Sequence, residues 1–475
     1  MKILLTGANG YIGRRLKNIL IQDLRIDLRI FVRNKKSLSK DILADFDVVE
    51  GDSFHLEDLE KALCGVDVAF YLIHSLHQEN YKDLDKISAQ NFITIAQKCN
   101  VKKIIYLGGL GVKNDHISEH LMSRIETGEI LSSSSLVQTI WIRAGVIIGS
   151  GSASFEIIRN LVEKLPCMIT PKWVETFAQP IGVDDVMSYL IEAIFLETQE
   201  SLIVDIGTNK MRYKEMMLET AEVLGLKRVL LSVPFMTIEL SSYWLNLFTP
   251  VSFGMAKALI EGLKSEVVIQ NDNAQKYFSH IEPMSYKQAV QKAVDEIKDN
   301  QVISRWSDTD GTTWDTTHHD KINDAIFVDR QIADLGHYDK EKVFKAIKSI
   351  GGKNGWFDYD FLWEIRGIID KAIGGAGLSR GRRDDCDLRL GECLDFWRVV
   401  DLDEGNRLLL LAQMKVPGDA WLEFKIEKNQ LIQSAYFYPK GIFGRLYWYS
   451  LVPLHYFIFK NMIQRILENS LVIER

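Results

Sequence analysis

The amino-acid sequence predicts a doubly wound α/β domain over residues 1–300, a linker over 301–322 and an α+β domain over 323–475. Three observations support this division. Strand and helix patterns alternate through residues 1–150, which is typical of parallel βαβ units. The residues of the predicted linker are mostly polar. Beyond them, short apolar strands follow one another across polar turns, which indicates an antiparallel sheet.

The chain begins with an apolar strand that leads into a glycine-rich turn. Glycines follow Ile3–Leu5 at positions 7, 10 and 13, and an amphipathic helix is expected over Tyr11–Leu20. Such glycines let the backbone approach a pyrophosphate, and the free N–H groups at the helix start attract its charge. The G-x-x-G-x-x-G spacing differs from the common G-x-G-x-x-G pattern. We expect a dinucleotide here; the alternative is an ordinary strand–helix turn.

Further strands are expected where short apolar runs recur between helical patterns: Ile3–Leu5, Leu28–Val32, Val48–Val49, Val68–Leu72, Lys103–Leu107 and Gln138–Ile142. The clearest helix between them is Tyr81–Lys98. In an open parallel sheet, ligands bind outside the carboxyl ends of the strands. The predicted cofactor-binding residues share a place at the glycine turn or at those strand ends: Gly7, Gly10, Tyr11, Ile12, Gly13, Arg33, Asp52, Ser53, Leu72, Gly108, Gly109, Ala144 and Gly145.

The end of the second strand indicates which dinucleotide binds. An NAD-specific site would place an Asp or Glu near this point to bind the ribose 2′-hydroxyl. The chain has Arg33 there, with Lys35 and Lys36 behind it. A guanidinium makes paired, charge-assisted hydrogen bonds to a phosphate. We therefore expect NADP rather than NAD; the alternative is a solvated basic strand end.

Three other positions have two interpretations each. Asp52 is placed to meet the adenine edge, or it belongs to the N-cap region of the next helix. Gly108 and Gly109 allow a nicotinamide ring to approach closely, or they form a glycine turn. After the sixth strand, either Ser152 or Ser154 is expected to cap the next helix.

Three strings carry a resemblance to a known superfamily: Thr6-Gly-Ala-Asn-Gly-Tyr-Ile-Gly13, Gly51-Asp52 and Arg143-Ala-Gly-Val-Ile-Ile-Gly149. They resemble the atypical branch of the short-chain dehydrogenase/reductase superfamily, and the resemblance covers residues 1–300. It implies an extended Rossmann domain that binds NAD(P).

The chain departs from that superfamily at the catalytic positions. The superfamily places a Ser after the fifth strand and a Tyr-x-x-x-Lys on the next helix, where the Tyr donates a proton. Here the Ser position holds Leu107-Gly108-Gly109, and the closest match to the Tyr and Lys is His120 and Arg124. His120 is the expected proton donor near neutral pH, and Arg124 the expected anchor for a ribose or phosphate. The alternative is that both are surface residues at a helix start.

Beyond the linker, strands are expected in series at Leu394–Val400, Arg407–Val416, Ala420–Ile426 and Leu431–Tyr438. A helix is expected before them over Lys340–Ser349. A closing helix is expected over Leu454–Leu467, with Pro453 in its first turn. This order resembles the helix-grip or START-like fold, whose sheet and helix enclose a hydrophobic cavity. Most aromatic side chains of this half are expected to form a packed core rather than a ligand cavity.

Three C-terminal strings make the resemblance more specific: Gly374–Asp384, Asp395–Val399 and Met414–Phe424. With the Rossmann-like half, they resemble a bacterial family of NAD(P)-binding proteins whose C-terminal half is a domain of unknown function of the DUF2867 type. The loop with Arg380, Arg382 and Arg383 has two interpretations. It binds a phosphate or carboxylate, or it pairs internally with the neighbouring aspartates, which is favoured.

Composition excludes several classes of protein. The net charge of −7 argues against a nucleic-acid partner. The five cysteines show no C-x-x-C pair, so neither a disulfide framework nor a zinc site is indicated. The adjacent His318 and His319 lie in a polar loop, where solvation is more common than metal binding. No run reaches the roughly 18 apolar residues of a membrane helix. We expect a cytoplasmic protein without a metal.

Residues 235–263 are rich in large apolar side chains, with Pro250 dividing them. Buried packing is the expected role of this segment. A wall of the substrate pocket, a homodimer face and a peripheral contact with a membrane surface are the alternatives.

The function supported first is that of an NADP-dependent oxidoreductase acting on an apolar carbonyl or quinone-like small molecule, with the hydride chemistry supplied by the cofactor. One alternative is a non-catalytic NADPH-binding sensor or assembly protein, which the missing Ser and Tyr-x-x-x-Lys favour. Another is a carrier of a hydrophobic ligand with a regulatory Rossmann domain.

Overall fold

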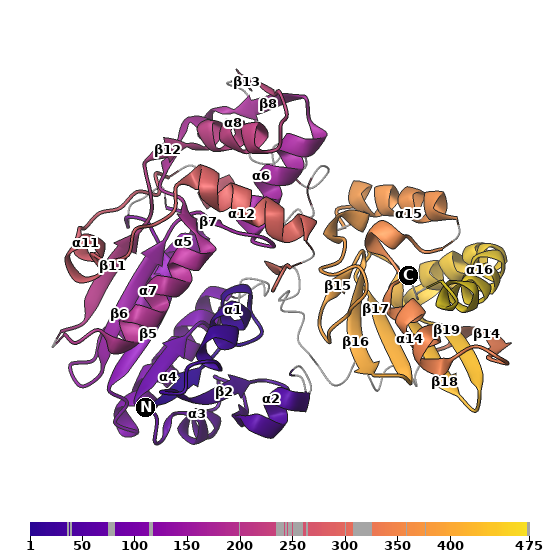
Figure 1. Cartoon of the computed structure of the whole chain (residues 1–475), viewed down its shortest axis with the longest axis horizontal. Helices are drawn as coiled ribbons and strands as arrows, with labels where there is room; N and C mark the ends of the chain where they lie inside the picture. The colour runs from indigo at the N-terminus through magenta and orange to yellow at the C-terminus, as the bar shows by residue number, and fades with distance from the viewer. Residues whose placement is uncertain are drawn as a thin grey trace. The chain divides into compact units, whose positions relative to one another are not determined.

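The computed structural model describes residues 1–35, 38, 40–74, 81–113, 117–198, 200–233, 242, 245, 249, 260–262, 265–299, 301–306, 325–357, 359–375 and 377–472. The described residues up to 306 form one compact unit, and those from 325 onward form a second (Figure 1). Most of the predicted linker and of the apolar segment 235–263 lies outside the described residues, as do His318 and His319.

A seven-stranded parallel sheet forms the centre of the first unit, as the sequence predicts. Its order is β11-β6-β5-β4-β1-β2-β3. The strands are β1 (Lys2–Leu5), β2 (Asp27–Val32), β3 (Asp47–Glu50), β4 (Val68–Tyr71), β5 (Lys103–Gly109), β6 (Gln138–Ala144) and β11 (Leu202–Ile206). The chain runs outward from β1 to β3, returns beside β1 at β4, and then runs outward in the opposite direction. A ligand crevice is expected at this reversal.

Helices cover both faces of the sheet (Figure 1). Helices α1 (Tyr11–Leu20) and α7 (Val183–Phe195) share one hydrophobic core, and α3 (Leu56–Leu63), α4 (Tyr81–Lys98) and α5 (Glu119–Leu131) share the other. Alternate strand residues enter the two cores: Ile3 and Leu5 enter the first, whereas Leu4 enters the second. A strand buried on both faces therefore appears in the sequence as a continuous apolar run.

A smaller lobe follows β6 and contains α6 (Ala153–Lys164), α8 (Tyr213–Val223) and α12 (Tyr286–Lys298). Of the two predicted caps for α6, Ser152 is the cap, because its side chain accepts a hydrogen bond from the N–H of Phe155 at 3.2 Å. The chain then returns to α1. The hydroxyl of Ser304 donates to the carbonyl of Tyr11 at 2.9 Å, and the N–H of Trp306 donates to Gly151 at 2.8 Å. Residues 301–306 are therefore packed on the first unit, and the predicted linker start at 301 is wrong.

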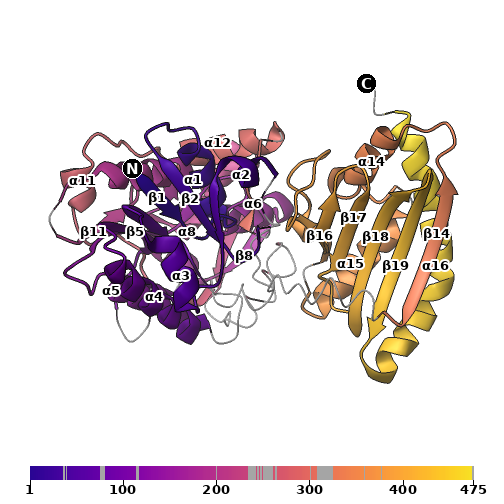
Figure 2. The ribbon, with the colours of Figure 1, turned by 90° about the horizontal axis from the view of Figure 1, so that it is seen from below.

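The second unit is a six-stranded antiparallel sheet of order β14-β19-β18-β17-β16-β15. The strands are β14 (Phe327–Asp334), β15 (Cys393–Leu394), β16 (Trp397–Asp403), β17 (Arg407–Ala412), β18 (Gly418–Glu427) and β19 (Gln430–Pro439). Helices α14 (Lys340–Lys348) and α16 (Gly441–Ser470) pack against this sheet, and Figure 2 shows α16 running along it. The predicted order of strands closed by a C-terminal helix is confirmed.

Three features of the second unit were not expected. The edge strand β14 and helix α15 (Asp360–Ala372) are additional, and α16 begins at Gly441 rather than Leu454. Pro453 therefore lies within the helix and not in its first turn, and the predicted start is wrong. The reason is local. Residues 441–452 are apolar on nearly all sides, so no period of 3.6 residues marks them as a helix, whereas the proline imitates a start signal.

The arginine loop is structural, as favoured. Arg382 is buried and donates to the carbonyls of Ile350 at 2.6 Å and Lys348 at 2.7 Å. Arg383 is also buried, and its guanidinium pairs with the buried carboxylate of Glu392. The described side chains of this loop are thus committed to internal bonds.

Two cysteines meet although the sequence indicated no disulfide. Cys64 at the end of α3 and Cys99 at the end of α4 form a disulfide, with their Cα atoms 4.8 Å apart. Their separation of 35 residues gives no local signal, because only the packing of α3 beside α4 brings them together. In a reducing compartment such a pair stays as thiols.

We expect the air-oxidised, denatured protein to show three reactive thiols, those of Cys167, Cys386 and Cys393, and five after reduction. Titration with a thiol reagent measures both numbers. The Cys64→Ser variant should show four thiols in either state, because it frees Cys99. Five thiols in the oxidised wild-type protein would contradict the pairing.

Candidate functional site

The glycine turn between β1 and α1 is packed directly on the end of β4. Gly7 has a φ of +65°, a conformation that side chains disfavour, and a Cβ there would lie 2.5 Å from the carbonyl oxygen of Leu72. A Cβ on Gly13 would lie 2.0 Å from the carbonyl oxygen of Gly7. Only glycine fits at these two positions, so the turn brings bare backbone to the reversal point of the sheet.

Helix α1 starts at this turn without a side-chain cap. Its N-cap residue is Gly10, which has no side chain to accept from the N–H groups of the first turn. Those groups and the positive end of the helix dipole suit an anion. The backbone of Tyr11 and Ile12 belongs to this first turn. The predicted pyrophosphate site is therefore an open helix N-terminus of the expected geometry.

The side chain of Tyr11 points elsewhere. Its buried hydroxyl lies near Gly149, where a Cβ would be 2.8 Å from it, and burial raises its pKa. The guanidinium of Arg15 lies 5.2 Å from the Tyr11 ring and donates to the carbonyl and hydroxyl of Ser150. Tyr11 thus joins α1 to the smaller lobe, and only its backbone faces the glycine turn.

Arg33 is exposed immediately after β2. It makes no hydrogen bond or ion pair with any residue that the structure describes. The neighbouring Lys35 is held in place through its N–H, which donates to Glu50 at 2.8 Å. An uncommitted guanidinium at this strand end fits a 2′-phosphate, which needs two parallel donors.

Asp52 serves a turn after β3. Its side chain accepts from the N–H of Phe54 at 3.1 Å, and its carbonyl accepts from His55, the N-cap residue of α3. This supports the helix-cap interpretation over an adenine contact. The carbonyls of Ser53, which is buried, and of Phe54 accept from the amide of Asn91.

Gly108 and Gly109 are the last two residues of β5 and pair with β6, so they do not form a turn. They pair with Arg143 and Ala144 of β6. A Cβ on Gly108 would lie 2.3 Å from Nε1 of Trp141, and one on Gly109 would lie 2.5 Å from Leu121. Neighbouring side chains explain why these residues are glycines, and a nicotinamide ring is not needed to explain them.

The remaining predicted strand-end residues line the same edge. Leu72 follows β4, and its N–H donates to the hydroxyl of Thr6 at 3.0 Å. Ala144 ends β6 and accepts from the N–H of Leu110 at 2.9 Å. Gly145 comes next, and a Cβ there would lie 2.6 Å from Val267.

A pair of histidines meets beyond these strand ends, and the sequence indicated only one of them. The ring centroids of His74, which follows β4, and of His120 on α5 are 5.1 Å apart. The Nδ1 atom of His74 lies 2.8 Å from the buried carboxylate of Asp85 on α4. The hydroxyl of Ser123 donates to the same oxygen at 3.1 Å. The four side chains come from three segments, so only the fold assembles them.

His120 is neutral in this environment. Burial, with help from His74 and Arg124, lowers its pKa to about 3. Its Nδ1 atom is enclosed and has no hydrogen-bond partner among the described residues. Its pKa argues against the expectation that its imidazolium is the acid near neutral pH, although a neutral ring can still donate an N–H bond.

Arg124 is engaged within the domain. Its guanidinium donates to the carbonyl of Leu107 and lies 5.5 Å from the ring of Tyr106, whose hydroxyl donates to the Arg124 carbonyl at 2.9 Å. These contacts tie α5 to β5. His120 and Arg124 are half-buried and contact other groups of the domain, so the interpretation of both as surface residues is not supported.

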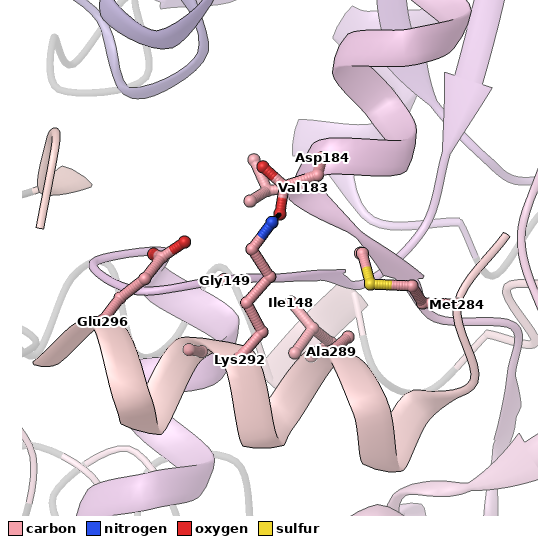
Figure 3. A pocket seen from close by; sticks show the side chains of 10 residues that line it. Ile148, Gly149, Val183, Asp184, Met284, Ala289, Lys292 and Glu296 are labelled. Carbon is pink, nitrogen blue, oxygen red and sulfur yellow. Dashed lines mark ion pairs between the residues drawn. The ribbon is translucent and has the colours of Figure 1, made fainter. Parts of the chain in front are cut away.

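A small pocket lies at the smaller lobe, between the start of α7 and α12 (Figure 3). Lys292 reaches across it from α12 and pairs with Asp184 at 2.7 Å. The pocket has an accessible volume of about 10 Å³, which is room for roughly one water molecule, so it is too small for a ligand. Among the described residues, no group of three or more His, Cys, Asp or Glu side chains is placed to hold a metal ion.

Comparison with protein families divides the chain in the same way as the fold. A family described as NAD(P)H-binding matches residues 7–139, and the protein of unknown function family DUF2867 matches residues 321–462. The auxiliary protein GraX of Staphylococcus aureus is 30% identical over 145 residues, which are 29% of this chain and 46% of GraX. The chain thus spans about half the length of this curated relative.

Solved structures match the first unit. A nucleoside-diphosphate-sugar epimerase from Staphylococcus aureus superimposes with a TM-score of 0.51 at 18% identity, covering 61% of this chain and 100% of its own. The triphenylmethane reductase of Citrobacter sp. superimposes with a TM-score of 0.51 at 19% identity, covering 62% of this chain and 100% of its own. Identities this low show a shared fold. The chain therefore consists of an NAD(P)-binding Rossmann domain, with epimerases and reductases as its structural neighbours, followed by a DUF2867 domain.

Proposed function

We propose that this protein is an NADP-dependent oxidoreductase that reduces an apolar carbonyl or quinone-like small molecule. One observation carries the cofactor assignment: the exposed guanidinium of Arg33 stands at the end of β2 without a partner among the described residues. The open N-terminus of α1 supplies the second anion site, for the pyrophosphate. When bound, NADPH would supply a hydride from its nicotinamide ring.

The chain itself must hold the substrate oxygen and provide its proton. We assign this work to His74 and His120, on the segments that follow β4 and β5. Asp85 accepts a hydrogen bond from Nδ1 of His74, which orients the ring. Neutral His120 beside it is suited to orient the substrate oxygen through an N–H bond. Arg124 keeps α5 on the sheet and is a positioning residue.

Two features indicate the substrate class. The Citrobacter neighbour is a reductase of triphenylmethane dyes, which are large aromatic molecules. A helix-grip arrangement of the second unit, with α16 along the antiparallel sheet, would suit an apolar ligand as well. An apolar carbonyl or quinone is consistent with both features and can accept a hydride.

Two other functions have specific support. A non-catalytic NADPH-binding sensor or assembly protein is favoured by α5, which contains neither Tyr nor Lys. A hydrophobic-ligand carrier is favoured by the second unit, where the buried indole N–H groups of Trp363, Trp397 and Trp421 have no acceptor among the described residues. Tight NADPH binding without turnover across a carbonyl and quinone panel would favour the sensor over the enzyme.

Arg33→Ala should raise the Kd for NADPH by about tenfold or more and change the Kd for NADH by less than about twofold, because a charged hydrogen bond to the 2′-phosphate is lost. Isothermal titration calorimetry measures both constants. Arg25→Ala is the matched control, since Arg25 is exposed and paired with Asp23. A preference for NADPH that survives in Arg33→Ala would sink the NADP assignment.

His74→Phe and His120→Phe should each lower kcat by roughly a hundredfold or more, the usual contribution of a positioned acid or donor. The Kd for NADPH should stay within about threefold in both variants, because neither ring belongs to the phosphate sites. Steady-state kinetics with the best substrate of the panel measures this. His280→Phe removes an exposed histidine and serves as control. Unchanged kcat in both variants would remove the pair from the mechanism.

The depressed pKa of His120 also predicts a pH-dependent stability. The unfolded ring takes up a proton near pH 6.5, whereas the folded ring stays neutral down to about pH 3. Between these values the unfolded state binds more protons, so this contribution to stability is present above pH 6.5 and is lost as the pH falls toward 3. The Tm of His120→Phe should therefore fall less between pH 7 and pH 4 than that of the wild-type protein. Equal slopes in calorimetric melts would contradict the lowered pKa of His120.

A further inference from the structure

Helix α16 of the second unit changes character along its length. In its C-terminal half the inward side chains, such as Met462 and Ile466, are buried, and the outward Gln464 and Arg465 are polar. That is the ordinary pattern of a helix packed on a core. In its N-terminal half most of the exposed side chains are apolar as well. The C-terminal half of α16 therefore shows the polar exposed side that the N-terminal half lacks.

The apolar outward side chains form one continuous face. Ile442 is 75% exposed, Phe443 81%, Leu446 60% and Tyr449 62%. Positions 442, 446, 449 and 456 follow the helical period, so they share a side of the helix, and Tyr456 is also exposed. We call Ile442, Phe443, Leu446, Tyr449, Tyr456 and Phe457 the outer face of α16.

The inward side of this half is already occupied. Trp448 stacks on Phe437 with ring centroids 5.6 Å apart, and on Phe327 at 5.5 Å. The helix therefore cannot rotate its outer face toward the sheet without exposing Trp448. An apolar surface of this extent on one helix usually marks an interaction site.

The charges on the helix indicate the kind of partner. Residues 441–467 contain Arg445, Lys460 and Arg465 and no Asp or Glu. Arg445 is exposed and has no ion pair among the described residues, and the ammonium of Lys460 lies 5.6 Å from the Tyr456 ring. Aromatic and apolar side chains flanked by basic residues suit an anionic lipid surface. A second copy of the same face would instead bring like charges together.

We propose that the outer face of α16 lies on an anionic membrane surface. The rings of Phe443, Tyr449 and Phe457 enter the boundary between headgroups and acyl chains, and Arg445 and Lys460 meet lipid phosphates. The helix lies on the bilayer, since no described helix is long and apolar enough to cross one. This binding is independent of the NADPH chemistry proposed for the first unit.

The test is co-sedimentation of the full-length protein with vesicles of phosphatidylcholine alone and of phosphatidylcholine with phosphatidylglycerol. We expect binding to the anionic vesicles that weakens with added salt, and weaker binding to the neutral ones. The double variant Phe443→Ser/Phe457→Ser should lower the partition coefficient by more than about tenfold, because two large apolar side chains are lost. Arg445→Gln should lower it about fivefold, and only on anionic vesicles.

Two controls match these changes elsewhere. Leu24→Ser removes a fully exposed apolar side chain from the first unit, and Arg465→Gln removes a basic residue from the polar half of α16. Arg445→Gln disturbs no buried contact, so it keeps the test decisive if the double variant folds poorly. Equal partitioning of the wild-type protein and the α16 variants would overturn the proposal. Failure of the wild-type protein to bind either kind of vesicle would also overturn the proposal. This holds even if sedimentation equilibrium shows a dimer that is lost in the double variant, because the outer face would then be a dimer interface.

Discussion

The hydroxyl of Thr6 holds together the part of the molecule on which the candidate site depends. It donates to the carbonyl of Phe70 at 2.8 Å and accepts from the N–H of Leu72 at 3.0 Å, and it is fully buried. These bonds join the carboxyl ends of β1 and β4 at the reversal of the sheet. Gly7 then passes beneath the Leu72 carbonyl, where a side chain has no room. This junction fixes the direction in which α1 starts. His74 lies two residues beyond Leu72, so the same junction also positions His74.

Most of the first unit could be predicted because its signals are local. The strand before Gly7, the helix Tyr11–Leu20 and the long helix Tyr81–Lys98 each occur where the chain pattern places them. Arg33 could be singled out because its position follows from the end of one strand. The partnership of His74 with Asp85 and His120 could not, because these residues come from three segments that meet only through the packing of α4 and α5 on the sheet. Such a contact leaves no fixed spacing of residues in the sequence by which it could be recognised.

The glycines show the same limit in another form. Gly13 lacks a side chain because of the Gly7 carbonyl, and Gly108 lacks one because of the Trp141 indole. In the sequence both glycines stand at a strand end or a helix start, and this position alone predicts a contact with a cofactor for each of them. The positions of the neighbouring atoms are needed to distinguish a glycine that exposes backbone to a ligand from one that leaves room for a neighbouring side-chain ring. In the second unit, the sequence did not predict α15. Its exposed side includes the apolar residues Phe361, Ile365 and Ile368, so the usual alternation of a polar exposed side and an apolar buried side is missing.

The return of the chain from the smaller lobe to α1 has a consequence for how the two halves can be separated. Ser304 and Trp306 supply hydrogen-bond donors to the carbonyls of Tyr11, in the first turn of α1, and of Gly151, just before α6. The last described residues of the first unit thus complete the surroundings of its opening motif, across 293 positions of sequence. A Rossmann half excised at residue 300 would leave both carbonyls without their donors. Dissection of this protein into independently folding parts should therefore cut beyond Trp306, in the polar stretch that follows it.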